Sequence, residues 1–303
     1  MNSIGNVGKK TLISLTIPIF LELLLVIVVG NIDTIMLGYY NDEAVGTIGG
    51  ITQLLNIQNV IFSFINLATA ILTAQFLGAK DYKRVKQVIS VSLVLNIFLG
   101  LVLGGIYLFF WRGLLQKINL PEELVGIGKY YFQMVGGLCV FQGIILSCGA
   151  ILKSHGRATE TLIINVGVNI LNIFGNSLFI FGWLGMPILG PTGVGISTVV
   201  SRGIGCLVAF YMMCKYCNFT FRKKYIRPFK IVKNILSIGF PTAGENLSWN
   251  VGQLIIVAMV NTMGTTIITS RTYLMLISNF IMTLSIALGQ GTAIQVGHLV
   301  GAG

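Results

Sequence analysis

Charged residues are scarce in this sequence. Asp, Glu, Lys and Arg together make up 10% of its 303 residues, against about 25% in a typical soluble domain. A soluble domain of this length needs more polar side chains than that to cover its surface. Prolines number only 6, and the 37 glycines follow no three-residue period, which excludes a collagen-like chain. With 54% hydrophobic residues and a mean hydropathy of +0.86, most of the chain belongs in lipid.

Cysteine and histidine are also few, which excludes several kinds of chemistry. The five cysteines lie in or beside apolar segments, and their odd number does not indicate a disulfide framework. Cys214 and Cys217 form a lone CxxC pair, which two thiols at a helix end explain without a metal or redox role. His155 and His298 lack a ligand partner at a useful spacing. We therefore expect no cofactor and no transition-metal site.

Long apolar segments dominate the rest of the sequence. A helix needs about 20 mainly apolar residues to cross a bilayer. The segments that reach this length are Leu12–Leu37, Gly46–Leu77, Val88–Trp111, Gly128–Leu152, Thr161–Leu184, Thr192–Cys214, Ile235–Asn261 and Thr265–Val300. We predict an all-α polytopic membrane protein with about eight transmembrane helices. The second and eighth segments are longer than a bilayer requires, which predicts a tilt, a break or an end outside the hydrocarbon.

Basic residues are distributed unevenly among the connecting segments. With a cytoplasmic N-terminus, 15 of the 20 Lys and Arg residues fall in cytoplasmic segments, in agreement with the positive-inside rule. The net charge of +11 is therefore a topology signal, and it favours anionic membrane lipids rather than nucleic acid as partners. We expect a multi-pass protein of the cell membrane with its N-terminus in the cytoplasm.

The two ends of the sequence resemble each other. A shift of 223 residues aligns them without a gap and places Pro18 on Pro241 and Glu22 on Glu245. An even number of spans separates the two copies, so both enter the membrane in the same direction, as in parallel transporter repeats. We predict three parts: an N-terminal six-helix lobe (1–220), a cytoplasmic basic linker (221–234) and the first two helices of an incomplete C-terminal lobe (235–303). On this repeat, we expect a complete protein of about 12 spans and about 450 residues.

Ionisable side chains inside the spans are the first functional candidates, because each costs about 2.5–3.5 kcal/mol at the bilayer centre on insertion scales. Glu22 and Asp33 lie 11 residues apart, on similar faces of one helix and about 16 Å apart along its axis. For Asp33 the alternative to a functional role is that of a hydrogen-bonded, inert residue at the solvated end of the first span. For Glu22 and Glu245 the alternative is to brace a helix that a proline interrupts. Arg202 can also snorkel or pair with an acid.

The fifth span carries a stripe of amides. Asn165, Asn169, Asn172 and Asn176 follow an i, i+4, i+7, i+11 spacing, which places them on one helix face. Such a stripe either packs helices through hydrogen bonds or offers oxygen ligands to a cation. Thr198 in the sixth span can supply another oxygen. An alkali cation or a proton suits these groups better than a transition metal does.

Several motifs, in order along the chain, resemble the multidrug and toxic compound extrusion (MATE) family. They are Pro18 with Glu22, Asn31–Gly38, Ala74–Lys80, Leu152–Gly156, Asn172–Gly182, Gly193–Thr198 and Val296–Ala302. The resemblance covers essentially the whole chain. It implies a transporter rather than an enzyme, with two six-helix lobes around a central cavity. It also implies export of drug-like, often cationic, compounds in exchange for entering sodium ions or protons.

The resemblance also assigns residues to ion coupling. The helix 1 acid of the family falls on Asp33, where Na⁺ would bind, its associated asparagine falls on Asn172, and Thr198 resembles a cation-site threonine. Some members have a second acid where this chain has Asn176, and this departure leaves Na⁺ and H⁺ both open as the coupling ion. Glu245 falls where many members carry a functional acid. Together with Glu22, it is a candidate for substrate binding or coupling. We expect small organic cations and membrane lipids as partners, and a monomer.

Two other functions fit the sequence less well. A lipid-linked oligosaccharide flippase of a related two-lobe fold would need cationic side chains in its cavity to hold a diphosphate, and Arg202 and Arg271 are the only candidates. An intramembrane enzyme would need a catalytic motif, and the sequence has no HExxH, no GxSxG and no paired aspartates in facing spans. Cation-coupled drug antiport by alternating access is the predicted function, with the flippase as the alternative.

Overall fold

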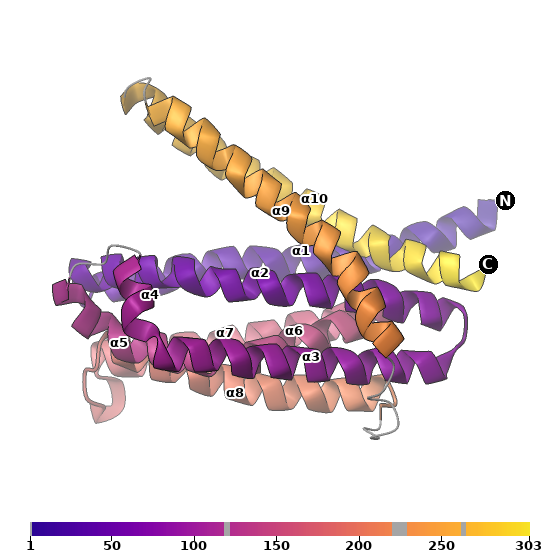
Figure 1. The fold of residues 1–303 in the computed structure, drawn as a ribbon, viewed down its shortest axis with the longest axis horizontal. Coiled ribbons are helices and arrows are strands. Elements are labelled where there is room, and N and C mark those ends of the chain that lie inside the picture. The colour runs from indigo at the N-terminus through magenta and orange to yellow at the C-terminus, as the bar shows by residue number, and fades with distance from the viewer. Residues whose placement is uncertain (1, 118–121, 220–228, 262–264) are drawn as a thin grey trace.

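The computed structural model describes residues 2–117, 122–219, 229–261 and 265–303, and every regular element in these ranges is a helix (Figure 1). Helices dominate because lipid offers no partners to backbone N–H and C=O groups, which a helix bonds within one segment. The elements are α1 (Asn2–Gly38), α2 (Asp42–Gly78), α3 (Tyr82–Phe109), α4 (Trp111–Lys117), α5 (Glu122–Gly137), α6 (Val140–Ser154), α7 (Ala158–Phe181), the 3₁₀ turn η1 (Trp183–Gly185), α8 (Pro191–Tyr216), α9 (Phe229–Asn261) and α10 (Thr265–Ala302).

Most of these helices are suited to crossing a membrane. Among the described residues, six helices are long and apolar enough to span a bilayer, and the bent pair α5–α6 makes up to seven spans. The predicted span Ile235–Asn261 is helical as part of α9, although several of its side chains lie outside the described residues. The prediction of an all-α polytopic membrane protein is confirmed.

The fourth predicted span, Gly128–Leu152, is bent rather than straight in the structure. The first half, α5, ends at Gly137, the second half, α6, begins at Val140, and the two are bent by 42°. The bend lies where this span crosses α3 at backbone contact, since a Cβ on Gly100 would collide with the backbone of Val140. Cys139 Sγ also donates to the carbonyl of Gly100 at 3.3 Å. The bend thus coincides with a contact to a residue 39 positions away in sequence, which composition does not reveal.

Polar side chains join α2, α3 and α6 inside the bundle. Asn66 and Asn96 exchange amide hydrogen bonds of 3.1 and 3.3 Å. Thr69 donates to Ser92 at 2.8 Å, and the hydroxyls of Ser92 and Ser147 pair at 3.0 Å. All five side chains are buried, where an unsatisfied polar group costs about 1–3 kcal/mol. These bonds hold the three helices at one depth relative to one another.

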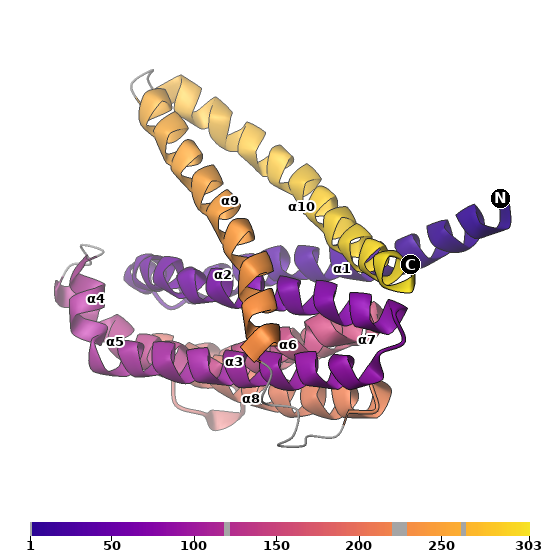
Figure 2. The ribbon, with the colours of Figure 1, turned by 45° about the vertical axis from the view of Figure 1, so that its right-hand side comes forward.

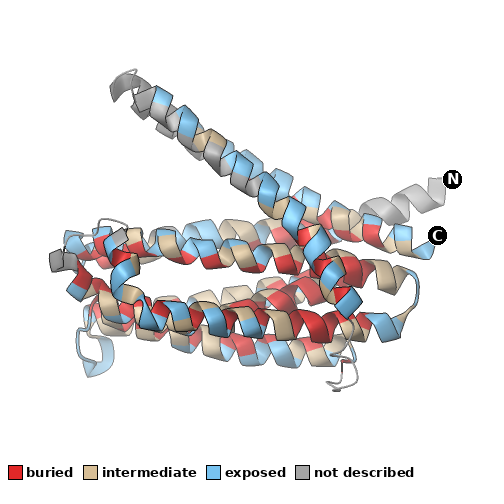
Figure 3. Ribbon diagram, in the orientation of Figure 1, coloured by how far each residue is buried: buried red, intermediate tan, exposed pale blue. Residues whose placement is uncertain are grey.

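The hairpin of α9 and α10 diverges from the bundle toward its tip (Figures 1 and 2). Its base lies on the bundle, where the start of α9 packs against α2 and α3. There, α10 packs against α1 and α2. This crossing is a backbone contact: a Cβ on Gly78 would collide with the carbonyl of His298, and a Cβ on Gly301 with that of Gln75. The described side chains farther along the hairpin are mostly exposed (Figure 3). The small residues at the crossing therefore determine how closely the hairpin approaches the bundle.

The two ends of the chain form similar helix pairs, as the repeat predicts. α1 contains Pro18 and α9 contains Pro241, while α2 and α10 have 37 and 38 residues. Both long helices are unbroken. The three-part division stays a prediction: α9 begins at Phe229, inside the predicted linker 221–234, and residues 220–228 lie outside the described part.

Candidate functional site

Asp33 lies near the C-terminal end of α1, which packs against α7. Its Oδ1 accepts a hydrogen bond of 2.8 Å from Nδ2 of Asn176 on α7. Asn176 is buried and Asp33 is partly buried. The structure therefore holds the carboxylate against the interior of the lobe through a charge-assisted hydrogen bond, the stronger kind.

The hydrogen bonds continue from α7 to α8. Nδ2 of Asn176 also approaches Oδ1 of Asn172 at 3.4 Å, one helical turn away. Nδ2 of Asn172 in turn donates to Thr198 Oγ1 at 3.1 Å and approaches Ser197 Oγ at 3.4 Å. The four predicted coupling residues, from three helices, thus lie in one connected cluster. Their role in coupling remains a prediction.

A close approach of α7 and α8 makes this cluster possible. Ser197 Oγ donates to the backbone carbonyl of Asn172 at 2.8 Å. A Cβ at Gly175 would collide with the Ser197 side chain. Any larger residue at position 175 would therefore push the helices apart and separate the amides of α7 from the hydroxyls of α8.

The cluster offers oxygen atoms to a cation. Oδ1 of Asn176 is buried and has no hydrogen-bond partner, and a buried polar atom of this kind is a natural ligand for an ion. It belongs to the residue that donates to the Asp33 carboxylate, and carboxylate and amide oxygens suit hard cations. In the described part of the chain, no three His, Cys, Asp or Glu side chains form a metal-binding group. Binding of a monovalent cation or a proton by this donor set stays a prediction.

Arg202 adds a positive charge to the same region. It lies on α8, one turn beyond Thr198, and its Nη1 is buried without a hydrogen-bond partner. Its charge interacts with Asp33 and with the buried Tyr131, but among the described contacts it makes no direct ion pair with Asp33. Arg202 therefore faces the lobe interior and does not snorkel to the membrane surface.

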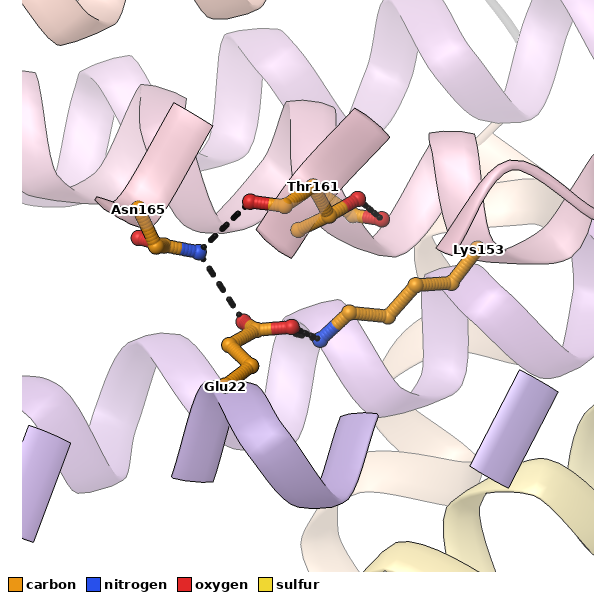
Figure 4. A network of polar contacts seen from close by, with 5 residues as sticks. Glu22, Lys153, Thr161 and Asn165 are labelled. Atoms are coloured by element: carbon orange, nitrogen blue, oxygen red, sulfur yellow. Dashed lines mark hydrogen bonds and ion pairs between the residues drawn. The ribbon is translucent and has the colours of Figure 1, made fainter. Parts of the chain in front are cut away.

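Glu22 belongs to a separate cluster, which Figure 4 shows. Its two carboxylate oxygens lie 3.0 and 2.8 Å from Lys153 Nζ at the end of α6. Asn165 on α7 donates to the same carboxylate at 3.1 Å and to the carbonyl of Thr161 at 3.1 Å. Glu22 thus joins α1 to α6 and α7, a bracing role that agrees with the structural alternative for this residue.

Glu245, the other predicted acid, lies on α9 with an exposed side chain. The structure does not bring it into the Asp33 cluster. The side chain of Arg271, which the flippase alternative requires, lies outside the described residues.

Sequence reasoning missed two residues of these clusters, Ser197 and Lys153. Ser197 adjoins the predicted Thr198 but has no distinguishing pattern of its own. Lys153 is one of the 15 basic residues in the predicted cytoplasmic segments, and the positive-inside rule accounts for a basic helix end without any partner. The spacing points only to the acid–amide pairs, because Glu22 and Asp33 are as far apart in sequence as Asn165 and Asn176. It carries no signal for Ser197 or Lys153.

The fold and the cluster define a polytopic membrane protein with a polar site inside a bundle of spanning helices. A family model described as MatE matches residues 18–178, more than half of the chain. The chain therefore belongs to the MatE family, whose members are transporters and not enzymes. The resemblance that the sequence motifs indicated is confirmed.

Curated relatives and solved structures agree with this assignment. The "Uncharacterized transporter YisQ" of Bacillus subtilis is 37% identical over 96% of this chain and 64% of its own length. The "Probable multidrug resistance protein NorM" of Thermotoga maritima is 30% identical over 81% of this chain and 53% of its own length. The chain thus spans between about half and two thirds of these relatives.

Two solved structures share the fold. One, of MATE in the bent conformation, has a TM-score of 0.88 and 20% identity, covering 97% of this chain and 66% of its own. The other, an outward-facing conformation of a multidrug resistance MATE family transporter, has a TM-score of 0.85 and 19% identity, covering 97% and 65%. Similarity at this level of identity concerns the fold alone.

Proposed function

We propose that this protein exports organic cations across the cell membrane in exchange for entering sodium ions or protons, with Asp33 as the coupling residue. One observation carries the proposal: Asp33 joins a chain of amides and hydroxyls inside a lobe of membrane-spanning helices. Carboxylates are rare at such positions because they are costly there, and they usually mark ion or substrate paths. The name of the Thermotoga relative, a multidrug resistance protein, supports organic compounds as substrates.

The contacts of Asp33 support either coupling ion. For Na⁺, the ligands are the Asp33 carboxylate and the unpartnered Asn176 Oδ1, with Thr198 Oγ1 linked to them through Asn172. For H⁺, the carboxylate alone is sufficient. The positive charge of Arg202 opposes any cation at this position.

The proposed mechanism is competition for one electrostatic site. An entering ion neutralises Asp33, and an organic cation then loses the carboxylate that attracts it. The ion gradient drives export only if the ion and the substrate bind the two access states with different affinities. Glu22 and Glu245 are proposed as further carboxylates on the substrate path, of which Glu22 is neutralised by Lys153 in this structure.

The orientation and partners follow from the same reasoning. We propose a cytoplasmic N-terminus, because most basic residues then face the cytoplasm. On that orientation the ends of α2 and α8 are cytoplasmic, and the exposed Lys80 and Lys215 there contact anionic lipids. One lobe contains the whole Asp33 cluster, so the proposal requires no second copy of the chain and the protein acts as a monomer.

Ethidium efflux from liposomes containing the purified full-length gene product tests this proposal. A sodium gradient and a proton gradient are imposed in turn, with Asp33→Asn as the control variant. Efflux under one gradient that is lost in Asp33→Asn supports ion-coupled antiport and identifies the ion. Efflux that is unchanged in Asp33→Asn overturns the role of Asp33. Folded protein without efflux under either gradient favours the flippase alternative, whose test is translocation of a diphosphate-bearing lipid.

A further inference from the structure

α1 and α7 carry two matching carboxylate–amide pairs. In the first pair Asn165 donates to Glu22 at 3.1 Å, and in the second pair Asn176 donates to Asp33 at 2.8 Å. Both pairs join residues 143 positions apart, so the two helices run in the same direction and keep one register over three turns. The pairs lie about 16 Å apart along the helices. Two further asparagines of the stripe lie between them on α7.

The two pairs differ in one respect. Glu22 has a cation in direct contact, since Lys153 Nζ lies 3.0 and 2.8 Å from its two oxygens. Among the described contacts, Asp33 has no ammonium or guanidinium group within ion-pair distance. The same constellation of carboxylate and amide therefore occurs twice, once with a resident cation and once without.

Lys153 is well placed to be a replaceable cation. Its ammonium group is carried on a flexible four-carbon chain, attached at the last turn of α6. The side chains of Lys153 and Glu22 are 15% and 11% exposed, so the ion pair is mostly but not completely enclosed. A mobile cation that replaces the ammonium group leaves the net charge at Glu22 unchanged and needs only a rotation of the lysine side chain.

We infer that Glu22 and Asn165 form a second site for a monovalent cation, which Lys153 occupies as a tethered counter-ion. While Lys153 is in place, its charge repels any cation from solution at the Glu22 pair. The Asp33 pair then remains available to such a cation. When Lys153 turns away, the Glu22 pair accepts an alkali cation or an alkylammonium group. The significance of this site for transport rests on the proposed function, whereas its existence does not.

Cation binding to purified variants tests this inference. All variants carry Asp33→Asn, so that the second pair contributes no carboxylate. The probes are radiolabelled methylammonium, which reproduces the head group of lysine, and sodium-22, each measured by equilibrium dialysis at pH 8. Removing the tethered cation with Lys153→Ala is expected to add one binding equivalent per chain for at least one probe. Adding Glu22→Gln to that variant is expected to remove it again.

A second variant of Lys153 is measured so that the test does not depend on the folding of Lys153→Ala. Lys153→Ala leaves a buried carboxylate without its partner and can prevent folding, so Lys153→Gln, which keeps a hydrogen-bond donor, is measured beside it. A folded Lys153 variant that binds no more of either probe than the protein with Lys153 overturns the inference. A gain in probe binding that persists when Glu22→Gln is added to the Lys153 variant also overturns the inference. The proposed function fails by a different result, ethidium efflux that is insensitive to Asp33→Asn, so the two failures are distinguishable.

Discussion

Replacing Asp33 with Asn removes one negative charge and little else. The Asn side chain has the same shape, and its carbonyl oxygen can still accept the 2.8 Å hydrogen bond from Asn176. The difference between a charged and a neutral acceptor is worth about 1 kcal/mol of unfolding free energy, so the variant is expected to fold. The attraction between a bound cation and a carboxylate at about 4 Å is about 4 kcal/mol at an effective dielectric constant of 20.

This attraction predicts how strongly Asp33→Asn weakens cation binding. Each 1.4 kcal/mol is about a factor of ten in affinity, and Arg202 offsets part of the attraction. We therefore expect ethidium to bind about 100- to 1,000-fold more weakly to Asp33→Asn than to the unaltered protein. The assay is a fluorescence titration of the purified protein with ethidium, with thermal unfolding as the measure of folding.

The matched control is Asp42→Asn, which makes the same chemical change at the exposed start of α2. It is expected to leave ethidium affinity within about twofold, because exposed charges are screened by water and salt. If Asp33→Asn is folded and binds ethidium as tightly as Asp42→Asn does, the electrostatic reasoning is refuted.

Gly78→Ala is expected to lower the unfolding free energy by about 1–3 kcal/mol, because its Cβ would collide with the backbone of α10 and overpacking strains both helices. Gly49→Ala, on the same helix with nothing within 4 Å, should not destabilise in the same thermal assay. Thr198→Val removes the acceptor of Asn172 and is expected to cost about 1 kcal/mol; an unchanged unfolding midpoint contradicts that contact. Burial lowers the pKa of His155, so its contribution to stability is present above pH 6.5 and is lost as the pH falls further. His155→Asn should flatten this pH dependence of unfolding, and an unaltered pH profile would exclude the assignment.

Much of the site can be predicted from periodicity alone. The four asparagines of α7 lie on one face because 3.6 residues per turn place them there. Asp33 is conspicuous because a carboxylate within an apolar span needs a polar partner. The identity of that partner cannot be predicted in this way, since no local rule connects Asn176 with Asp33 across 143 residues.

The residues that escaped prediction are those whose role depends on a distant helix. Lys153 at a helix end is already accounted for by membrane topology. Only the tertiary structure, in which α1 packs against α7 and α7 against α6, places Glu22 within 2.8 Å of it. The break at the end of α5 likewise lies where this span contacts Gly100 on α3. Such contacts depend on volumes and registers that a single segment does not contain.

By itself, then, the amino-acid sequence determined the membrane environment, the approximate spans, the repeat and the polar faces of α1 and α7. These are local properties: transfer of apolar groups into lipid depends on each segment, and a helix repeats at a fixed angle. Tertiary structure alone decided which amide meets which carboxylate, that Glu22 is paired with a lysine while Asp33 is not, and that Gly175 lets α8 reach Asn172. The physical reason is that these pairings follow from the close packing of helices, and packing is a property of surfaces that meet only in the folded chain.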